Sequence, residues 1–300
     1  MILVTGGGGF IGSRVCRLLC SKKLDVVALD RSFAATPPCT RVQGDVSCAD
    51  FLAELFHAYS FDSVVHLASV LNTASCRHPD EALRINMGGS LDLLQLAIQF
   101  EVKNFVYGSS ISVYGEKCYE DYGEVSESEP ASPSNVYGVS KRFVEIVGEQ
   151  YRQQGLLQFA ALRISIVVGP GATNTSSPWR SQIFEQLSAR QPTLIHLPFA
   201  RDKIIPVIHV EDVAEAIGRL IEASRPRFAI YNTPSENWRC NDLADYIRKL
   251  NRNVELAFSA STGRGDPDAI LGSRFLAEFD FNPVPLKERL RLAAGNMQPA

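Results

Sequence analysis

A cluster of glycines between an apolar segment and a helical pattern constrains the fold of this chain most. The chain opens with MILVT, an apolar run of strand length, and amphipathic sequence follows over about residues 10–22. The glycines between them have the order G-x-x-G-x-x-G. Glycine permits a tight turn and lets backbone N–H groups approach a pyrophosphate at a helix N-terminus. We therefore predict a strand–turn–helix unit that binds a dinucleotide. The predicted cofactor contacts in this unit are Gly6, Gly9, Phe10, Ile11 and Gly12.

Apolar segments of strand length alternate with amphipathic segments along the first half of the chain. Strands that are apolar throughout are typical of a parallel sheet buried on both faces. We therefore predict an α/β fold, a doubly wound parallel Rossmann sheet with helices on both sides and a smaller C-terminal substrate lobe. The predicted strands are 1–5, 25–29, 62–67, 104–108 and 158–164, and the predicted helices are about 10–22, 48–59, 80–100 and 135–154. The apolar stripe expected on helix 80–100 consists of Leu83, Met87, Leu91, Leu94 and Ile98.

The strand–helix alternation is interrupted at two places. Residues 116–134 are acidic and rich in Pro, Ser and Glu, which indicates a loop ending near helix 135–154. Gly, Pro, Thr and Ser interrupt the alternation again between 170 and 203, and it resumes over 204–231. The predicted domains are a dinucleotide-binding domain, 1–170, to which 204–232 returns, and a substrate-binding lobe made of 171–203 and 233–300.

Composition and charge argue against several classes of protein. The 300 residues carry a net charge of -3 with no basic cluster, so we expect no nucleic-acid partner. No run of 18 apolar residues occurs, and Met1 is followed directly by an apolar strand, so we expect a cytoplasmic protein without a membrane partner. The seven scattered cysteines are interpreted as reduced packing residues, and the five histidines lack the spacing of a metal site.

A carboxylate ends the second predicted strand. Asp30 lies 18 residues after Gly12, where an acidic side chain hydrogen-bonds the adenosine ribose of a dinucleotide. Its charge would repel a 2′-phosphate, so we expect NAD rather than NADP. Arg31 keeps NADP open as an alternative, because its cation would pair with that phosphate. In the G-D-V segment, Asp45 and Val46 are expected beside the adenine, although Asp45 would serve equally as an N-cap of the next helix.

A tyrosine and a lysine form the strongest catalytic signal. Tyr137 and Lys141 stand four residues apart, on one face of the predicted helix 135–154. A neighbouring cation stabilises a phenolate, so a tyrosine with an ordinary pKa of about 10 becomes a usable base near neutral pH. Ser110 follows the predicted strand 104–108, at the carboxyl end where α/β sheets build their sites. We predict Ser110, Tyr137 and Lys141 as the catalytic residues, with Ser109 and Ser112 as alternatives to the serine.

Together these motifs resemble the extended short-chain dehydrogenases/reductases, the NAD-dependent epimerase/dehydratase family. The resemblance covers nearly the whole chain and includes TGGGGFIG, HLAS, Asn86, SSISVYG, PASPSNVYGVSK, LRISIVVGPG and IHVEDVAEAI. It implies an NAD site at the glycine motif and acid–base catalysis by Ser110, Tyr137 and Lys141. The further cofactor contacts that it implies are Leu67, Ala68, Ser69, Tyr137 and Lys141.

The positions that hold the substrate depart from the family pattern. UDP-sugar members usually have Asn where this chain has Ile166, and often Arg where it has Ile205. Both changes remove groups that would match a diphosphate. Arg264 does match an anion-binding arginine of the family, and it would serve a single carboxylate or anchor the lobe equally well. The candidate substrate contacts are Ser69, Ser112, Ser165, Trp179, Arg180 and Arg264.

The predicted reaction is hydride transfer between NAD and a secondary alcohol carbon of a sugar or sugar-like substrate, by an epimerase or a dehydrogenase. The first alternative is an NAD-dependent dehydrogenase of a small hydroxy acid, such as a sugar acid or threonine. A non-catalytic NAD-sensing protein is a more distant alternative, because it would need no catalytic trio. A dehydratase is disfavoured, since no carboxylate follows Ser110. We also expect a homodimer.

Overall fold

The computed structural model describes residues 1–33, 37–115, 124–172, 177–260 and 267–295. Its largest element is a seven-stranded sheet in the order β11-β7-β5-β4-β1-β2-β3, with every neighbouring pair parallel. The chain leaves β1 first toward β2 and then toward β4, so the strand order reverses at the carboxyl ends of β1 and β4, the point where such sheets bind ligands. The strands are β1 (Ile2–Thr5), β2 (Val26–Asp30), β3 (Thr40–Gln43), β4 (Ser63–His66), β5 (Asn104–Ser110), β7 (Gln158–Ile164) and β11 (Ile230–Asn232).

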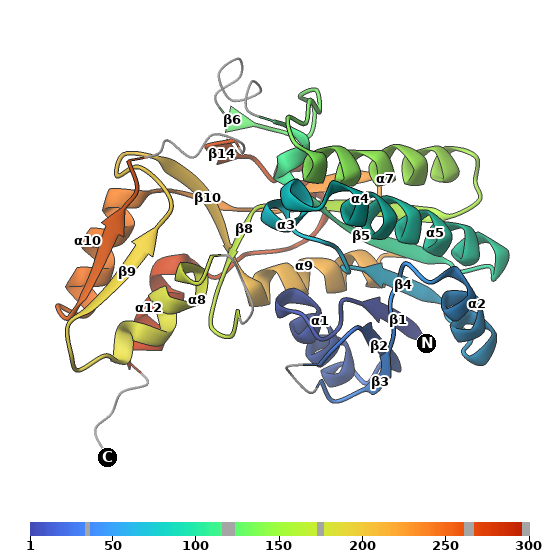
Figure 1. The fold of residues 1–300 in the computed structure, drawn as a ribbon, viewed down its shortest axis with the longest axis horizontal. Coiled ribbons are helices and arrows are strands. Elements are labelled where there is room, and N and C mark those ends of the chain that lie inside the picture. The colour runs from blue at the N-terminus through green and yellow to red at the C-terminus, as the bar shows by residue number, and fades with distance from the viewer. Residues whose placement is uncertain (34–36, 116–123, 173–176, 261–266, 296–300) are drawn as a thin grey trace.

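Helices cover both faces of this sheet (Figure 1). On one face α1 (Phe10–Ser21) and α9 (Val210–Glu222) pack against the sheet and against each other. On the other face lie α2 (Ala49–Ala58), α5 (Ser90–Gln99) and α7 (Val136–Gln153). Strand residues such as Val4 and Leu3 are fully buried in these two cores, which is the burial that the predicted parallel sheet requires. The predicted doubly wound fold is therefore confirmed.

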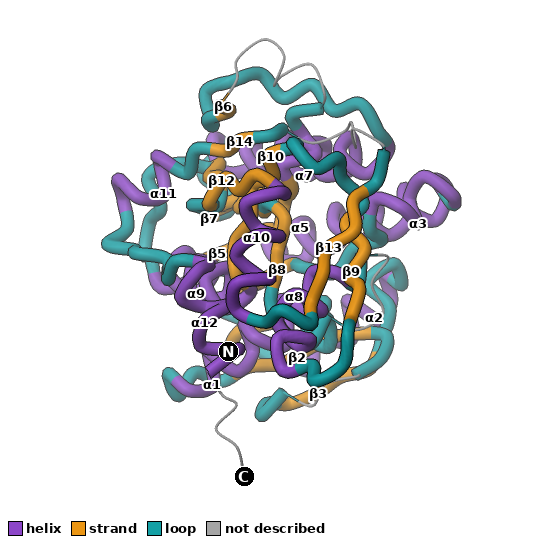
Figure 2. Tube along the Cα trace, turned by 90° about the vertical axis from the view of Figure 1, so that its left-hand side faces the viewer, coloured by secondary structure: helices purple, strands orange, loops and turns teal. Residues whose placement is uncertain are grey.

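The second lobe has its own sheets and its own core (Figure 2). Strand β10 (Ile204–His209) lies between β8 (Ile166–Val168) and β12 (Glu236–Arg239), and β9 (Thr193–Leu197) pairs with β13 (Val254–Phe258). Helices α8 (Trp179–Glu185), α10 (Cys240–Leu250) and α12 (Leu286–Gly295) pack with these strands. The segment 204–232 is thus shared, since α9 and β11 belong to the main sheet and β10 to the lobe.

The remaining elements are short. Strand β6 (Glu124–Val125), inside the segment predicted as a loop, pairs with β14 (Ala269–Ile270). Two single helical turns, η2 (Ile111–Val113) and η3 (Gln186–Ser188), follow β5 and α8. Helices α3 (Asn72–Arg77) and α11 (Ser273–Glu278) are also short. None of the described helices is long and apolar enough to cross a bilayer.

The helix predicted over 80–100 is interrupted by a π-helical segment. It consists of α4 (Pro79–Ala82), the π-helix η1 (Leu83–Gly89) and α5. The wider π turn rotates the side chains that precede α5 relative to a regular helix. Leu83 is therefore 49% exposed, and Ile85, which the predicted stripe omits, is buried instead. The predicted stripe is wrong at Leu83 for this reason.

Candidate active site

The glycine-rich turn joins β1 to α1 at the carboxyl end of β1, where the strand order reverses. Gly6 has φ +70°, and a Cβ at this position would lie 2.8 Å from the backbone N of Ala68. A Cβ at Gly12 would lie 2.0 Å from the carbonyl oxygen of Gly6, so both positions exclude a side chain. Around Gly9 a Cβ would meet one atom alone, the Gly6 oxygen at 3.1 Å. The turn is thus closed at two glycines and open at the third, which fits a pyrophosphate at the start of α1.

Asp30 lies directly beside this turn. Its Oδ2 accepts a hydrogen bond of 3.0 Å from the backbone N of Gly8, and its Oδ1 accepts one of 3.3 Å from Ser32 N. The guanidinium of Arg31 lies 3.7 Å from the Glu81 carboxylate, and its side chain is 62% exposed. The Asp30 carboxylate is therefore held at the glycine turn, while the Arg31 guanidinium is paired with Glu81 on α4. This arrangement suits a free ribose hydroxyl better than a 2′-phosphate.

Asp45 shapes the turn before α2. Its Oδ1 accepts hydrogen bonds from the backbone N and the hydroxyl of Ser47, at 2.9 and 2.7 Å. Burial raises the pKa of Asp45, but these hydrogen bonds and the nearby Arg31 and Arg84 lower it overall. The N-cap of α2 is Cys48, without a side-chain cap, so the interpretation of Asp45 as that cap is wrong.

The loop after β4 lies against the glycine turn. Leu67 and Ala68 each donate a backbone hydrogen bond of 3.2 Å to the Thr5 hydroxyl at the end of β1. Their backbones therefore lie against the glycine turn, and Ser69 follows them, half-buried. Val46 is buried in the same core cluster as Val70, and its carbonyl oxygen lies close to Gly89 of the segment after α4.

The three predicted catalytic residues come together at the carboxyl end of β5. Ser110 is the last residue of β5, and its hydroxyl accepts a hydrogen bond of 3.2 Å from Ser112 N. Tyr137 lies in the first turn of α7, which Asn135 caps by accepting from Gly138 N at 2.9 Å. A Cβ at Gly138 would lie 2.3 Å from the Ser112 carbonyl oxygen, so this glycine lets α7 approach the serine turn closely.

Lys141 reaches the same place from one turn further along α7. Its Nζ donates to the Gly108 carbonyl oxygen at 2.7 Å and lies 5.6 Å from the centre of the Tyr137 ring. Burial lowers the pKa of Lys141 to about 7, and the neighbouring Glu145 opposes this shift. Burial also lowers the pKa of His66 to about 3, so His66 is a neutral neighbour of this lysine.

The serine alternatives have other contacts. Ser109 is buried and donates a hydrogen bond of 2.6 Å to Glu145, on the side away from Ser110. Ser112 is 4% exposed and accepts from the Ser110 hydroxyl at 3.2 Å. Ser110 therefore fits the predicted role better than Ser109 does, with Ser112 beside it.

The predicted substrate contacts are less well supported. Trp179 is 1% exposed and packs edge-on against Phe199 inside the lobe core, so its prediction as a substrate contact is corrected. The Ser165 hydroxyl is 2.6 Å from that of Ser235, and the carbonyl of Arg180 accepts from Gly169 N. Arg264 lies outside the described residues.

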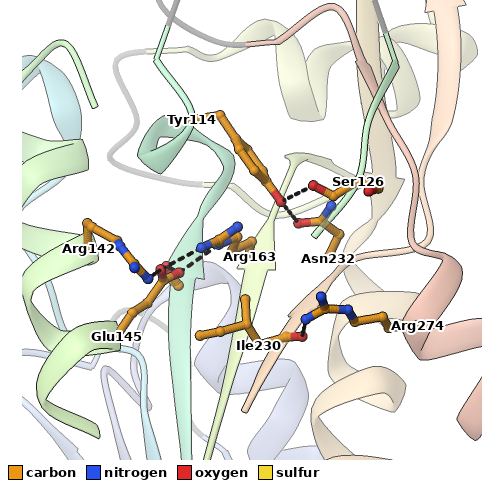
Figure 3. Close-up of polar contacts among 9 residues, drawn as sticks. Tyr114, Ser126, Arg142, Glu145, Arg163, Ile230, Asn232 and Arg274 are labelled. Atoms are coloured by element: carbon orange, nitrogen blue, oxygen red, sulfur yellow. Dashed lines mark hydrogen bonds and ion pairs between the residues drawn. The ribbon is translucent and has the colours of Figure 1, made fainter. Parts of the chain in front are cut away.

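Two buried networks behind the site were not predicted. In the first, the carboxylate of Glu145 is held by Arg142, Arg163 and Ser109, and Figure 3 shows both arginines pointing at it. A carboxylate four residues after Lys141 would have suggested a place on the same helix face, but nothing local pointed to a partner on β7.

The second network runs through the imidazole of His66. It contacts the Thr5 hydroxyl at 2.6 Å on one side and the Ser90 hydroxyl at 2.8 Å on the other. Asn86, which the sequence singled out only as part of a family motif, accepts from Val70 N at 2.7 Å and donates to Ser140 on α7 at 3.3 Å. These bonds tie the glycine turn, the π-helix and α7 into one unit. Among the described residues no cluster of His, Cys, Asp or Glu could hold a metal ion.

Fold and site together define a Rossmann-type protein with a serine, a tyrosine and a lysine at the carboxyl edge of its sheet. The model of the NAD dependent epimerase/dehydratase family matches residues 2–233, and the chain belongs to this family. It is 33% identical over 174 residues to a UDP-glucose 4-epimerase of Lacticaseibacillus casei, which covers 56% of this chain and 52% of the relative. The chain thus spans about half the length of the first curated relatives that it matches. A UDP-glucose 4-epimerase of Corynebacterium glutamicum is 26% identical and covers 97% of this chain and 92% of its own.

Solved structures match the fold over the full chain. The holo form of a GalE-like L-threonine dehydrogenase from Cupriavidus necator superposes with a TM-score of 0.89 at 21% identity, covering 99% of both chains. A UDP-glucose 4-epimerase of Thermus thermophilus, in complex with NAD, gives 0.84 at 22% identity, covering 98% of this chain and 97% of its own. At these identities the likeness confirms the fold.

Proposed function

We propose that the chain is an NAD-dependent oxidoreductase that acts on a secondary alcohol carbon of a sugar or sugar-like substrate. One observation carries the proposal: Ser110, Tyr137 and Lys141 converge at the edge of β5, beside a glycine turn that is open at Gly9. We further propose that residues 1–170 bind NAD with help from 204–232, and that 171–203 and 233–300 bind the substrate.

Each residue of the trio has a distinct role in this proposal. Bound NAD supplies the hydride acceptor or donor at C4 of its nicotinamide. Tyr137 takes the proton of the substrate hydroxyl, and the ammonium of Lys141 favours the phenolate form that accepts it. The Ser110 hydroxyl donates a hydrogen bond to the reacting oxygen. Release of the ketone would make the enzyme a dehydrogenase, and its reduction from the other face would make it an epimerase.

Cofactor retention and turnover test this proposal separately. Native mass spectrometry of the purified protein should show retained NAD and any retained nucleotide sugar. NADH formation should then be followed with a panel of UDP-sugars, sugar acids and hydroxy amino acids. A protein that binds no NAD and oxidises nothing in the panel would contradict the proposal, and NAD binding without turnover would favour the NAD-sensing alternative.

A small hydroxy acid is the second candidate for the substrate. Ile166 and Ile205, which stand where UDP-sugar members carry Asn and often Arg, are 7% and 1% exposed inside the lobe core. Neither offers a polar group to a diphosphate. The threonine dehydrogenase likeness agrees with this candidate, and the Ser165 and Ser235 hydroxyls are polar groups on the two connections that lead from the main sheet into the lobe.

We propose that the protein forms a homodimer through helix α7 and the π-helix beside it. Val139 and Ile146 are 47% and 50% exposed on one face of α7, with the half-buried Phe143 between them, and Leu83 on η1 is 49% exposed. Spacings of four and three residues place the α7 side chains in one stripe. α7 packs beside α4, η1 and α5, so the stripe and Leu83 lie on neighbouring helices, and in the proposed dimer a second copy pairs with this helix layer.

A reducing compartment, the cytoplasm, is the location that we propose. The described cysteines are all free, and several of them are packed in the cores. Burial raises the pKa of the Cys20 and Cys39 thiols, which disfavours the thiolate form that oxidises.

A further inference from the structure

A third ionisable side chain lies on the same face of α7 as the tyrosine and the lysine. Tyr137, Lys141 and Glu145 are spaced by four residues, so their side chains follow one another along the helix. Lys141 is 2% exposed and Glu145 is fully buried. The carboxylate is thus one turn from the lysine, and two turns, about 12 Å of helix axis, from the tyrosine.

Glu145 is fixed in place from three directions. Arg163 on β7 donates to both of its oxygens, at 2.9 and 2.8 Å. Arg142 donates at 3.0 Å (Figure 3), and the hydroxyl of Ser109 on β5 donates at 2.6 Å. A buried carboxylate with this many charge-assisted hydrogen bonds stays in one position.

Arg163 is itself held from the far side. Its guanidinium lies 4.6 Å from the centre of the Tyr114 ring, and the Tyr114 hydroxyl donates to Asn232 at 2.8 Å (Figure 3). The Glu145 position is therefore set by β5, β7 and β11 together, and not by α7 alone.

Lys141 meets few other charges. The ring of Tyr107 on β5 lies 4.8 Å from its Nζ, that of Tyr137 lies 5.6 Å away, and His66 on β4 is neutral. Burial raises the pKa of Tyr107 well above its usual value, so this residue is also uncharged. The ionisable residues on the helices packed against α7 are exposed or half-buried, where water screens their charge; they are Arg77, Asp80, Glu81, Arg84 and Asp92.

We propose that Glu145 is a positioning residue, which keeps the Lys141 ammonium charged and directed at Tyr137. A buried ammonium loses its proton unless an anion lies nearby, and Glu145 is the anion that the fold places one turn away. Its effect on Tyr137 runs through Lys141, because the direct distance is two helical turns. This inference rests on the proposed function, since it takes Tyr137 and Lys141 to be the acid–base pair.

Replacing the carboxylate by an amide of the same shape tests the electrostatic role. In Glu145→Gln the ammonium should lose its proton at lower pH, so that Tyr137 works beside a neutral amine and ionises only at higher pH. The pH at which kcat/KM for alcohol oxidation reaches half its maximum should therefore rise by about one unit, a tenfold loss at pH values below that limb. Glu149→Gln on the same helix, eight residues from Lys141, is the matched control and should leave the profile unchanged.

A double variant separates electrostatics from folding. Glu145→Gln alone leaves the Arg163 guanidinium buried without its carboxylate and should lower the melting temperature. Glu145→Gln with Arg163→Gln removes both charges and should recover part of that stability, and because the neighbouring cation is lost with the carboxylate, the pH profile should move back toward the wild-type position. A lowered melting temperature with an unchanged pH profile in Glu145→Gln would show that Glu145 acts through stability alone and would overturn the inference.

A readout without substrate keeps the inference testable if the proposed reaction is wrong. The phenolate absorbance of Tyr137 can be isolated by subtracting the ultraviolet pH titration of Tyr137→Phe from that of the intact protein. In the Glu145→Gln background the midpoint of this difference titration should lie about one pH unit higher, because Tyr137 then ionises beside a neutral amine. An unchanged difference titration would refute the role of Glu145, whatever the protein turns over.

Discussion

Adding one methyl group at Gly12 tests the dinucleotide turn most directly. In the structure a Cβ at this position would lie 2.0 Å from the Gly6 carbonyl oxygen and 2.7 Å from the Gly6 carbonyl carbon. Both are backbone atoms, so no change of rotamer relieves the overlap. Because ordinary contacts begin above 3 Å, the turn and the start of α1 must separate by about 1 Å in Gly12→Ala.

The expected cost follows from that displacement. Alanine gains about 1 kcal/mol over glycine inside a helix, and overpacking costs about 1–3 kcal/mol, so the net change in stability should be modest. NAD binding should suffer more, because a displaced turn misdirects its N–H groups. Two lost charge-assisted hydrogen bonds at about 1.5–3 kcal/mol each would weaken binding by roughly 10²-fold or more.

Calorimetric titration with NAD and a thermal melt measure the two effects. Gly88→Ala is the control, because a Cβ there would meet only the Leu83 carbonyl oxygen, at an ordinary 3.8 Å, within the same helical stretch. It should bind NAD as the wild type does. If Gly12→Ala binds NAD within about threefold of the wild type, the assignment of the cofactor to this turn is refuted, since the overlap leaves no undisturbed turn.

Three other expectations can be checked with single measurements. Tyr137→Phe should lower kcat by about 10²–10⁴-fold with NAD affinity within a few-fold, and activity above a tenth of wild type would remove Tyr137 from the mechanism. NAD should be preferred over NADP in kcat/KM because Asp30 is anchored at the turn; equal values would assign the site to Arg31. Ile146→Glu should convert the dimer to monomer in light scattering by placing a carboxylate in the apolar stripe, and an unchanged mass would exclude that face as the interface.

The parts of the fold that could be predicted are those with a local cause. An apolar run such as MILVT is long enough for one buried strand, and the glycines after it permit a single kind of turn. β3 was missed because its sequence, TRVQ, is polar, as befits an edge strand that is exposed along most of its length. The sequence does not predict the π-helix, because its wider turn depends on tertiary packing against α7.

Ser110, Tyr137 and Lys141 could be singled out from the sequence because they are close together in it or lie next to the end of a strand. The networks behind it depend on residues far apart in the chain: Thr5 and His66 are separated by 61 positions, and Glu145 and Arg163 by 18. Such pairs follow from the strand order, which brings Thr5 opposite His66 in the parallel register. The side chains that tune the site thus become visible only once the sheet is assembled.

The second lobe shows the same limit more strongly. Ile166 and Ile205 could be recognised as unusual, but their burial in the lobe core depends on the pairing of β8 with β10 and on the helices packed around them. Trp179, predicted as a substrate contact, supports that same core instead. An aromatic residue in a Ser- and Pro-rich segment can line a pocket or pack in the core. Which of the two occurs depends on the core volume that the other elements leave unfilled. Since that volume is closed by α8, β9 and β10 together, the identity of the substrate contacts follows from packing that no local pattern encodes.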